Sequence, residues 1–207
     1  MCVRFSGISW AEVEQIISSL ENSSALRLAH PEALRPADAF PGAYAPAIMQ
    51  NSTMRLTPKQ LVWGFDFKGK RNALFNTRLE TAAASPFWAE SFKSRRCIVP
   101  ALGFYEKHST RMGVNPETGK SIKQLYRFED PQNWVLLMAG IWNQDSFSIM
   151  TTKPHAKVAP IHDRSPLLLS PANALRWLSF QNAEPQHIDL VAQAQYAPAH
   201  TQSSLDL

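Results

Sequence analysis

Cysteine is scarce in this chain, and long apolar runs are absent from it. Only two cysteines occur in 207 residues, Cys2 and Cys97, and their spacing fits neither a zinc site nor a disulfide framework. No run reaches the roughly 18 apolar residues that a membrane span needs, and the N-terminus lacks the basic-then-apolar order of a secretory signal. We therefore expect a cytoplasmic protein, associated with the nucleoid if bacterial, with no membrane partner.

The composition is that of an ordinary globular protein, with 44% hydrophobic and 18% charged residues. We find no internal repeat, and we expect one domain over residues 1–207, with a core over about 2–195 and a mobile polar tail over 196–207. The net charge of +4 suits a polyanionic partner, although solvated lysines explain it equally well. No cofactor, metal or obligate protein partner is indicated, and we expect a monomer.

Two helices carry clear start signals. Ser9 and Glu12 fit a capping box, and apolar residues at helical spacing continue from there to about residue 21. Ser170-Pro171 begins a second helix well, because serine caps the first turn and proline fits there. Weaker helical character occurs over residues 85–92 and 184–194. Four prolines over residues 31–46 predict a long loop.

The remaining apolar runs predict many short strands, with turns between them. The predicted strands cover residues 3–6, 47–56, 60–65, 74–79, 97–99, 103–107, 124–128, 134–142 and 147–152. Pro100 is expected to divide two of them, residues 109–121 to form an exposed turn, and residues 143–146 to form a hairpin. This order predicts a single-domain α+β fold in which the strands form a barrel-like mixed sheet with flanking helices.

Cys2 directly follows the first methionine. Because the side chain of residue 2 is small, we expect Met1 to be removed, which leaves an α-amine and a thiol on adjacent carbons. An aldehyde can form an imine with this amine and then close onto the thiol, giving a five-membered thiazolidine ring. No internal cysteine can do this. The simpler interpretation is a chance cysteine on a frayed terminus.

Three other segments place polar groups among apolar residues. In an extended Asn76-Thr77-Arg78-Leu79-Glu80, alternate side chains would share one face, either as a site or as a solvated Arg–Glu pair. Glu106 ends an apolar strand, where partial burial would raise the pKa of its carboxyl group and suit it to proton transfer. His162 lies between apolar residues and a charged pair, and alone it would fit a structural histidine equally well.

Taken in order, these motifs resemble the SRAP family, the SOS-response-associated peptidases that process abasic sites. The motifs that carry the resemblance are Cys2, Trp63-Gly64, Asn76-x-Arg78-x-Glu80, Arg96-Cys97-x-x-Pro100-x-x-Gly103-Phe104-Tyr105-Glu106, Ala139-Gly140-Ile141-Trp142 and Ile161-His162-Asp163-Arg164-x-Pro166. The resemblance runs from residue 2 to about 178. It implies an SRAP-like fold and covalent capture of abasic sites in single-stranded DNA, together with self-removal of Met1 and lyase products.

The resemblance also implies residue roles. Cys2 would be the nucleophile, Asn76 would hold the Cys2 terminus and the sugar, Glu106 would act as general acid and base, and His162 would assist proton transfer. DNA contacts are implied for Arg4, Arg78 and Arg164, which would grip phosphates, and for Pro46 and Trp63, which would wedge or stack beside the missing base.

Some positions depart from the family. Val3 stands where the family has glycine, and Lys107 stands where it has tryptophan. Two alternatives therefore stay open at this stage: a non-catalytic single-strand-binding module, and a thiol peptidase that pairs Cys97 with His162. Cys97 has the surroundings of a small core residue, which disfavours the second.

Overall fold

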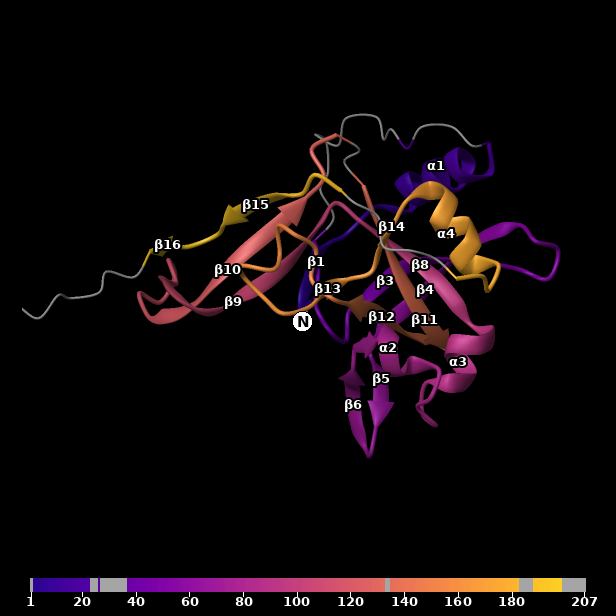
Figure 1. Cartoon of the computed structure of the whole chain (residues 1–207), viewed down its shortest axis with the longest axis horizontal. Helices are drawn as coiled ribbons and strands as arrows, with labels where there is room; N and C mark the ends of the chain where they lie inside the picture. The colour runs from indigo at the N-terminus through magenta and orange to yellow at the C-terminus, as the bar shows by residue number, and fades with distance from the viewer. Residues whose placement is uncertain (1, 23–25, 27–36, 133–134, 183–187, 199–207) are drawn as a thin grey trace, which may run out of the picture.

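A closed ring of strands forms the centre of the molecule. The computed structural model describes residues 2–22, 26, 37–132, 135–182 and 188–198. The ring runs in hydrogen-bonded order β12–β4–β3–β8–β11 and back to β12 (Figure 1). Its strands are β3 (Tyr44–Gln50), β4 (Leu56–Trp63), β8 (Arg96–Ala101), β11 (Leu136–Asn143) and β12 (Ser146–Thr152). This closure confirms the predicted barrel-like α+β fold, and it removes free strand edges from the ring.

Short strands extend the ring, and a small hairpin projects from it. The parallel strand β7 (Asn76–Arg78) and β13 (Ser165–Pro166) pair with β12, and β14 (Leu168–Leu169) pairs with β11. β5 (Phe65–Phe67) and β6 (Lys70–Leu74) form a separate two-stranded hairpin. The result is a barrel with short irregular additions.

A second sheet is built on one long hairpin beside the barrel. β9 (Gly103–Val114) and β10 (Ser121–Glu129) form this hairpin, which extends away from the barrel in Figure 1. β1 (Arg4–Ser6) pairs with β9 and with β2 (Asp38–Ala39), whereas β15 (Val191–Ala194) pairs with β10 and β16 (Ala197–Pro198) with β9. The beginning of the chain is thereby held in a sheet near the middle of the molecule.

The two predicted helices form where their caps indicate. In α1 (Trp10–Glu21) both hydrogen bonds of the capping box between Ser9 and Glu12 are present, and the Ser170 side chain caps α4 (Pro171–Leu178). Shorter helices are α2 (Leu79–Ala82) and α3 (Ala89–Ser94). No helix in the described ranges is long and apolar enough to cross a membrane.

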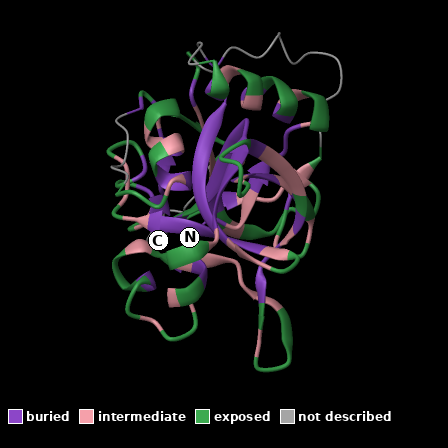
Figure 2. Ribbon diagram, turned by 90° about the vertical axis from the view of Figure 1, so that its right-hand side faces the viewer, coloured by how far each residue is buried: buried purple, intermediate pink, exposed green. Residues whose placement is uncertain are grey.

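The buried side chains of the described residues gather in two clusters. One, which includes Phe5, Phe104 and Phe147, contains residues of both sheets, and the other, which includes Ile16 and Trp177, lies under α1 and α4. Figure 2 shows this arrangement as buried strands at the centre with the outer faces of the helices exposed. Burial of these apolar side chains is the main stabilising contribution to the fold.

Two prolines that were expected to interrupt strands lie within them. Pro46 is paired within β3, and Pro100 is paired with Leu137 inside β8. The predicted loop up to residue 46 and the division at Pro100 are therefore wrong at these positions. The β3–β8 register contains only the pair Ile48–Ile98, so both prolines have an open side where no N–H donor is needed.

Other boundaries also differ from the predictions. The predicted strand over 47–56 is broken by a turn in which Asn51 Oδ1 accepts bonds from the N–H groups of Thr53 and Arg55. The hairpin strands extend into 109–121, so the exposed turn there is shorter than predicted. Residues 191–194 are strand rather than helix, because β10 offers them a partner edge. The predicted tail beyond residue 198 lies outside the described residues.

Candidate active site

Cys2 is held in the core and does not fray. Its side chain is fully buried, and its backbone oxygen accepts a 2.7 Å hydrogen bond from Asn76 Nδ2. The Sγ atom lies 3.5 Å from the backbone oxygen of Arg4, and the backbone of Tyr105 is also within hydrogen-bonding reach of it. These contacts contradict the interpretation of position 2 as a chance cysteine on a mobile end.

Glu106 is a buried carboxyl group on β9. Its side chain is only 1% exposed, and its neighbour Phe104 stacks on Phe128 on the same face of the strand. Burial raises the pKa of the Glu106 carboxyl group to about 7, and the negative charge of Asp163 adds to the shift. A carboxyl group with this pKa both gives and takes protons near neutral pH.

The two groups expected to transfer protons line the same pocket. It has a volume of about 570 Å³ and is lined by Val3, Glu106, Lys107, Ser109, Lys123, Ala159, His162 and Asp163. Burial lowers the pKa of the His162 ring, so the neutral imidazole predominates near pH 7.

The thiol of Cys2 is electrostatically coupled to this site. Burial raises its pKa, and the charge of Glu106 raises it further. The thiol therefore stays protonated at neutral pH, and nucleophilic attack by Sγ needs a base. The charge of Glu106 acts on the Cys2 thiol, which makes its carboxylate the candidate base.

The Asn76–Glu80 segment is not a single extended strand. β7 ends at Arg78, and α2 begins at Leu79, so the expected row of three side chains on one face is wrong. Glu80 pairs with Arg164 rather than with Arg78. Arg78 is exposed and has no ion-pair partner within the described ranges, which leaves its guanidinium accessible to an anion.

Arg4 lies on the other side of the sheet from Glu106. Its guanidinium forms an ion pair with Asp38 and stacks 4.2 Å from the centre of the Tyr105 ring. Since Tyr105 and Glu106 are consecutive in β9, their side chains point to opposite faces. The structure therefore does not bring Arg4 to the pocket, which argues against the predicted phosphate contact.

Trp63 and Pro46 differ from the predicted stacking pair. Trp63 is fully buried, packs 4.9 Å from the Phe5 ring, and donates its indole N–H to the Phe75 backbone oxygen. No ring face is available to a base, so the predicted stacking role of Trp63 is wrong. Pro46 is half-buried and lines a different hollow, beside Trp10 and Tyr44.

Two pocket residues escaped the sequence reasoning. Lys123 lies on β10, and its positive charge contributes to the lowered pKa of His162. Asp163 lies 3.0 Å from His162 Nδ1. Asp163 was part of the motif that contains His162 but was given no role, whereas Lys123 comes to the pocket through the pairing of β9 with β10, which spacing alone does not reveal.

These features define a strand-rich protein in which Glu106 and His162 line one pocket and the buried Cys2 is electrostatically coupled to Glu106. Among the described residues, no group of three or more His, Cys, Asp or Glu side chains is placed to hold a metal ion. Over residues 1–204 the chain matches the family described as SOS response associated peptidase (SRAP), and it belongs to that family.

Its relatives agree with this assignment. The chain is 30% identical over 129 residues to abasic site processing protein YoqW of Bacillus subtilis (58% of this chain, 54% of that protein). It is 31% identical over 124 residues to abasic site processing protein YobE of the same organism (56% and 53%). The chain thus spans about half the length of the curated relatives it matches.

Solved structures share the fold at lower identity. A phage-related protein of Bordetella bronchiseptica superimposes with a TM-score of 0.68 at 20% identity, over 96% of this chain and 100% of that one. A second protein of the same organism gives a TM-score of 0.65 at 21% identity, over 93% and 99%. Both support the α+β architecture, and neither carries an argument about activity.

Proposed function

We propose that this protein captures abasic sites in single-stranded DNA through Cys2 after Met1 has been removed. The observation that carries the proposal is the placement of Cys2, whose backbone oxygen is held by Asn76 and whose thiol is coupled to the buried Glu106. Two relatives whose names describe abasic site processing support the same substrate.

The capture reaction joins the aldehyde of a ring-opened deoxyribose to the aminothiol of Cys2. The α-amine adds to the aldehyde carbon, and loss of one water leaves an imine. Cys2 Sγ then forms a bond to the imine carbon, the thiol proton passes through Glu106, and a proton ends on the nitrogen. The product is a thiazolidine that links protein and DNA, and the balance is aldehyde plus aminothiol giving thiazolidine plus water.

Glu106 and His162 have complementary parts in this sequence. With a pKa of about 7, Glu106 accepts the proton of the Cys2 thiol and returns it when the link reverses. His162 assists the proton transfers at the imine and the sugar hydroxyl. Hydrolysis of the Met1–Cys2 bond and β-elimination from the imine would use the same groups, which accounts for peptidase and lyase activities in one site.

The experiment is incubation with single-stranded DNA that contains one abasic site, followed by a denaturing gel. We expect a shifted band for the wild-type protein and for Cys97→Ala, and none for Cys2→Ala. Cys97→Ala is the matched control, because it removes the other buried thiol. Intact mass of the wild-type protein should show that Met1 is absent.

Two other results would each identify a different function. A shift seen only in native gels, and equally with Cys2→Ala, would indicate a single-strand-binding module. Peptide cleavage that depends on Cys97 would indicate a thiol peptidase, but Cys97 is buried in β8 and packs against Gly140 of β11. Binding of single-stranded DNA through exposed Arg78 should weaken as salt rises, because phosphate contacts release counterions.

A further inference from the structure

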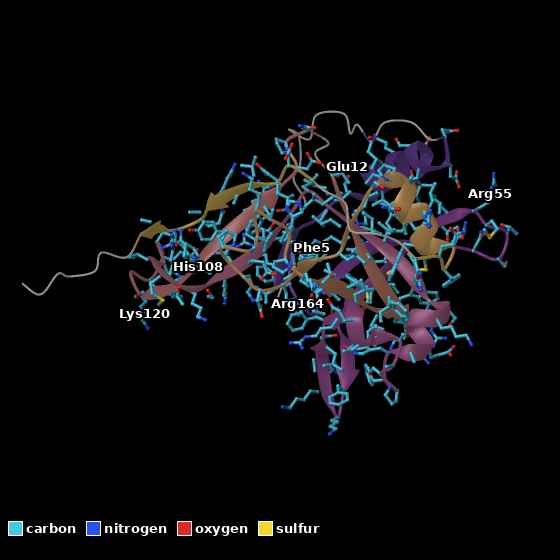
Figure 3. The ribbon with its side chains drawn as sticks, in the orientation of Figure 1. Phe5, Glu12, Arg55, His108, Lys120 and Arg164 are labelled. Atoms are coloured by element: carbon cyan, nitrogen blue, oxygen red, sulfur yellow. The ribbon has the colours of Figure 1, made fainter. Side chains whose placement is uncertain are left out.

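Glu80 and Arg164 form a two-point ion pair beside the pocket. Arg164 Nη1 lies 3.0 Å from Glu80 Oε1, and Nη2 lies 2.8 Å from Oε2. Nη2 also donates to the backbone oxygen of Thr151 at 2.6 Å. Glu80 is in α2 and Thr151 in β12, so one guanidinium ties the segment after His162 to two elements of the barrel. Figure 3 labels Arg164 between the β9–β10 hairpin and the lower helices.

The same residue also holds the His162 ring through its backbone. Both backbone groups of Arg164 face His162 Nδ1, with the nitrogen 3.0 Å and the carbonyl oxygen 3.3 Å from it. The N–H group donates to Nδ1 when that atom carries no proton, and the oxygen accepts from Nδ1 when it does. Asp163 Oδ1 lies 3.0 Å from the same ring nitrogen. The position of the Arg164 backbone therefore holds the orientation of the His162 ring.

The geometry points to Glu80 and Arg164 as positioning residues that fix the orientation of His162, a role that, for catalysis, rests on the proposed capture function. The Arg164 side chain is only 14% exposed, and its Nη groups are directed to Glu80 and Thr151. Because both Nη atoms already donate to Glu80 and Nη2 also donates to Thr151, these bonds argue against the phosphate contact predicted for Arg164. A planar guanidinium suits the task, because its two parallel bonds to a carboxylate fix direction as well as distance.

Several charged groups act on His162 together with this pair. Asp163 follows it in the chain, Lys123 approaches from β10, and Glu106 and Lys107 of β9 line the same pocket. Burial is the first cause of the lowered pKa of the ring. If the ion pair is broken, the 162–164 segment loosens, water reaches the ring, and its pKa rises toward the ordinary value.

The test uses Glu80→Gln and Arg164→Lys in the full chain. Glu80→Gln keeps the shape and removes the charge, whereas Arg164→Lys keeps the charge and removes the two-point geometry. Nitrogen NMR of the histidine rings, with His162 assigned by a His162→Asn sample, reports the pKa of its ring without DNA. The pH profile of cross-link formation is measured in parallel. We expect both variants to raise the pKa of His162 and to slow cross-linking roughly tenfold.

The matched control is Glu90→Gln, which breaks an exposed ion pair with Arg95 on α3. It should change neither the His162 signals nor the rate. Unchanged His162 titration in both test variants would overturn the inference, even if the rate fell. If the wild-type protein forms no cross-link at all, the capture function fails, while the NMR titration still decides whether the ion pair positions His162.

Discussion

The two cysteines occupy regions that match in burial and differ in chemistry. Both side chains are fully buried, and burial raises the pKa of both thiols. Around Cys2 lie the amide of Asn76, the backbone of Tyr105 and the carboxyl group of Glu106. Burial and a raised thiol pKa therefore do not by themselves separate a nucleophile from a core residue.

The surroundings of Cys97 are those of a packed barrel wall. It lies in β8 opposite Gly140 of β11, and its backbone oxygen accepts a 3.1 Å bond from the Trp177 indole. A Cβ atom on Gly140 would come within 2.9 Å of Cys97 Sγ, so the sulfur fills the space that the glycine leaves. Only the cysteine beside a titratable carboxyl group has a partner for proton transfer.

The largest contrast should come from replacing each sulfur with oxygen. Cys2→Ser should abolish the stable cross-link and change the free energy of unfolding little, because polar backbone groups of Arg4 and Tyr105 meet the hydroxyl. Cys97→Ser should keep cross-linking and lower stability by about 1–3 kcal/mol, the cost of a buried hydroxyl without a good partner. Denaturing gels and urea unfolding measure the two effects. If Cys2→Ser and Cys97→Ser cross-link DNA to the same extent and unfold at the same urea concentration, the two cysteines do not differ in the way proposed.

A second effect should appear in the pH dependence of stability. The folded-state pKa of Glu106 is raised from 4.5 to about 7, so its contribution to stability is fully present below pH 4.5 and is lost as pH rises through 7. This loss amounts to at most about 3 kcal/mol. Glu106→Gln should remove it, and the variant should gain stability relative to wild type between pH 5 and pH 8.

Capture kinetics check the same residue independently. With the glutamine in place, cross-links should still form, although more slowly because the Cys2 thiol loses its base, and their reversal should be slower, since no carboxyl group returns the proton to sulfur. Thermal unfolding across that pH range and release of DNA from the purified cross-link are the measurements. A pH profile of stability that is identical in variant and wild type would mean that Glu106 is not the buried acid.

The sequence predicted elements with local signals and missed relations that depend on pairing. The caps at Ser9 and Ser170 determine where α1 and α4 begin, because side chain and amide are only three residues apart. Pro46 and Pro100 fit within strands because of where β3 and β8 meet, which no local pattern encodes. Trp63 was expected at a surface, although its burial depends on Phe5 and Phe75, which are distant in sequence.

The same limit applies to the site. Glu106 could be identified from its own strand. A carboxyl group at the end of an apolar run becomes buried when that run packs into the core, and burial raises its pKa. The partner of Arg164 could not be identified from the sequence, because Glu80 is 84 residues away and lies in a helix where an extended strand was expected. Motif order indicated which residues to consider, and only the barrel topology shows which of them touch.

The smallest effect we expect concerns the barrel wall alone. Gly140→Ala places a methyl group 2.9 Å from Cys97 Sγ and 3.3 Å from the Ser148 backbone oxygen, both closer than ordinary contact. Overpacking of this kind costs about 1–3 kcal/mol. Cys97→Ala in the same chain should recover part of the loss, because it removes the atom in closest contact. Urea unfolding of the single and double variants measures this coupling, and additive costs would show that Cys97 does not fill the space beside Gly140. Cross-linking through Cys2 should be unaffected in all three proteins, since neither Gly140 nor Cys97 lines the pocket.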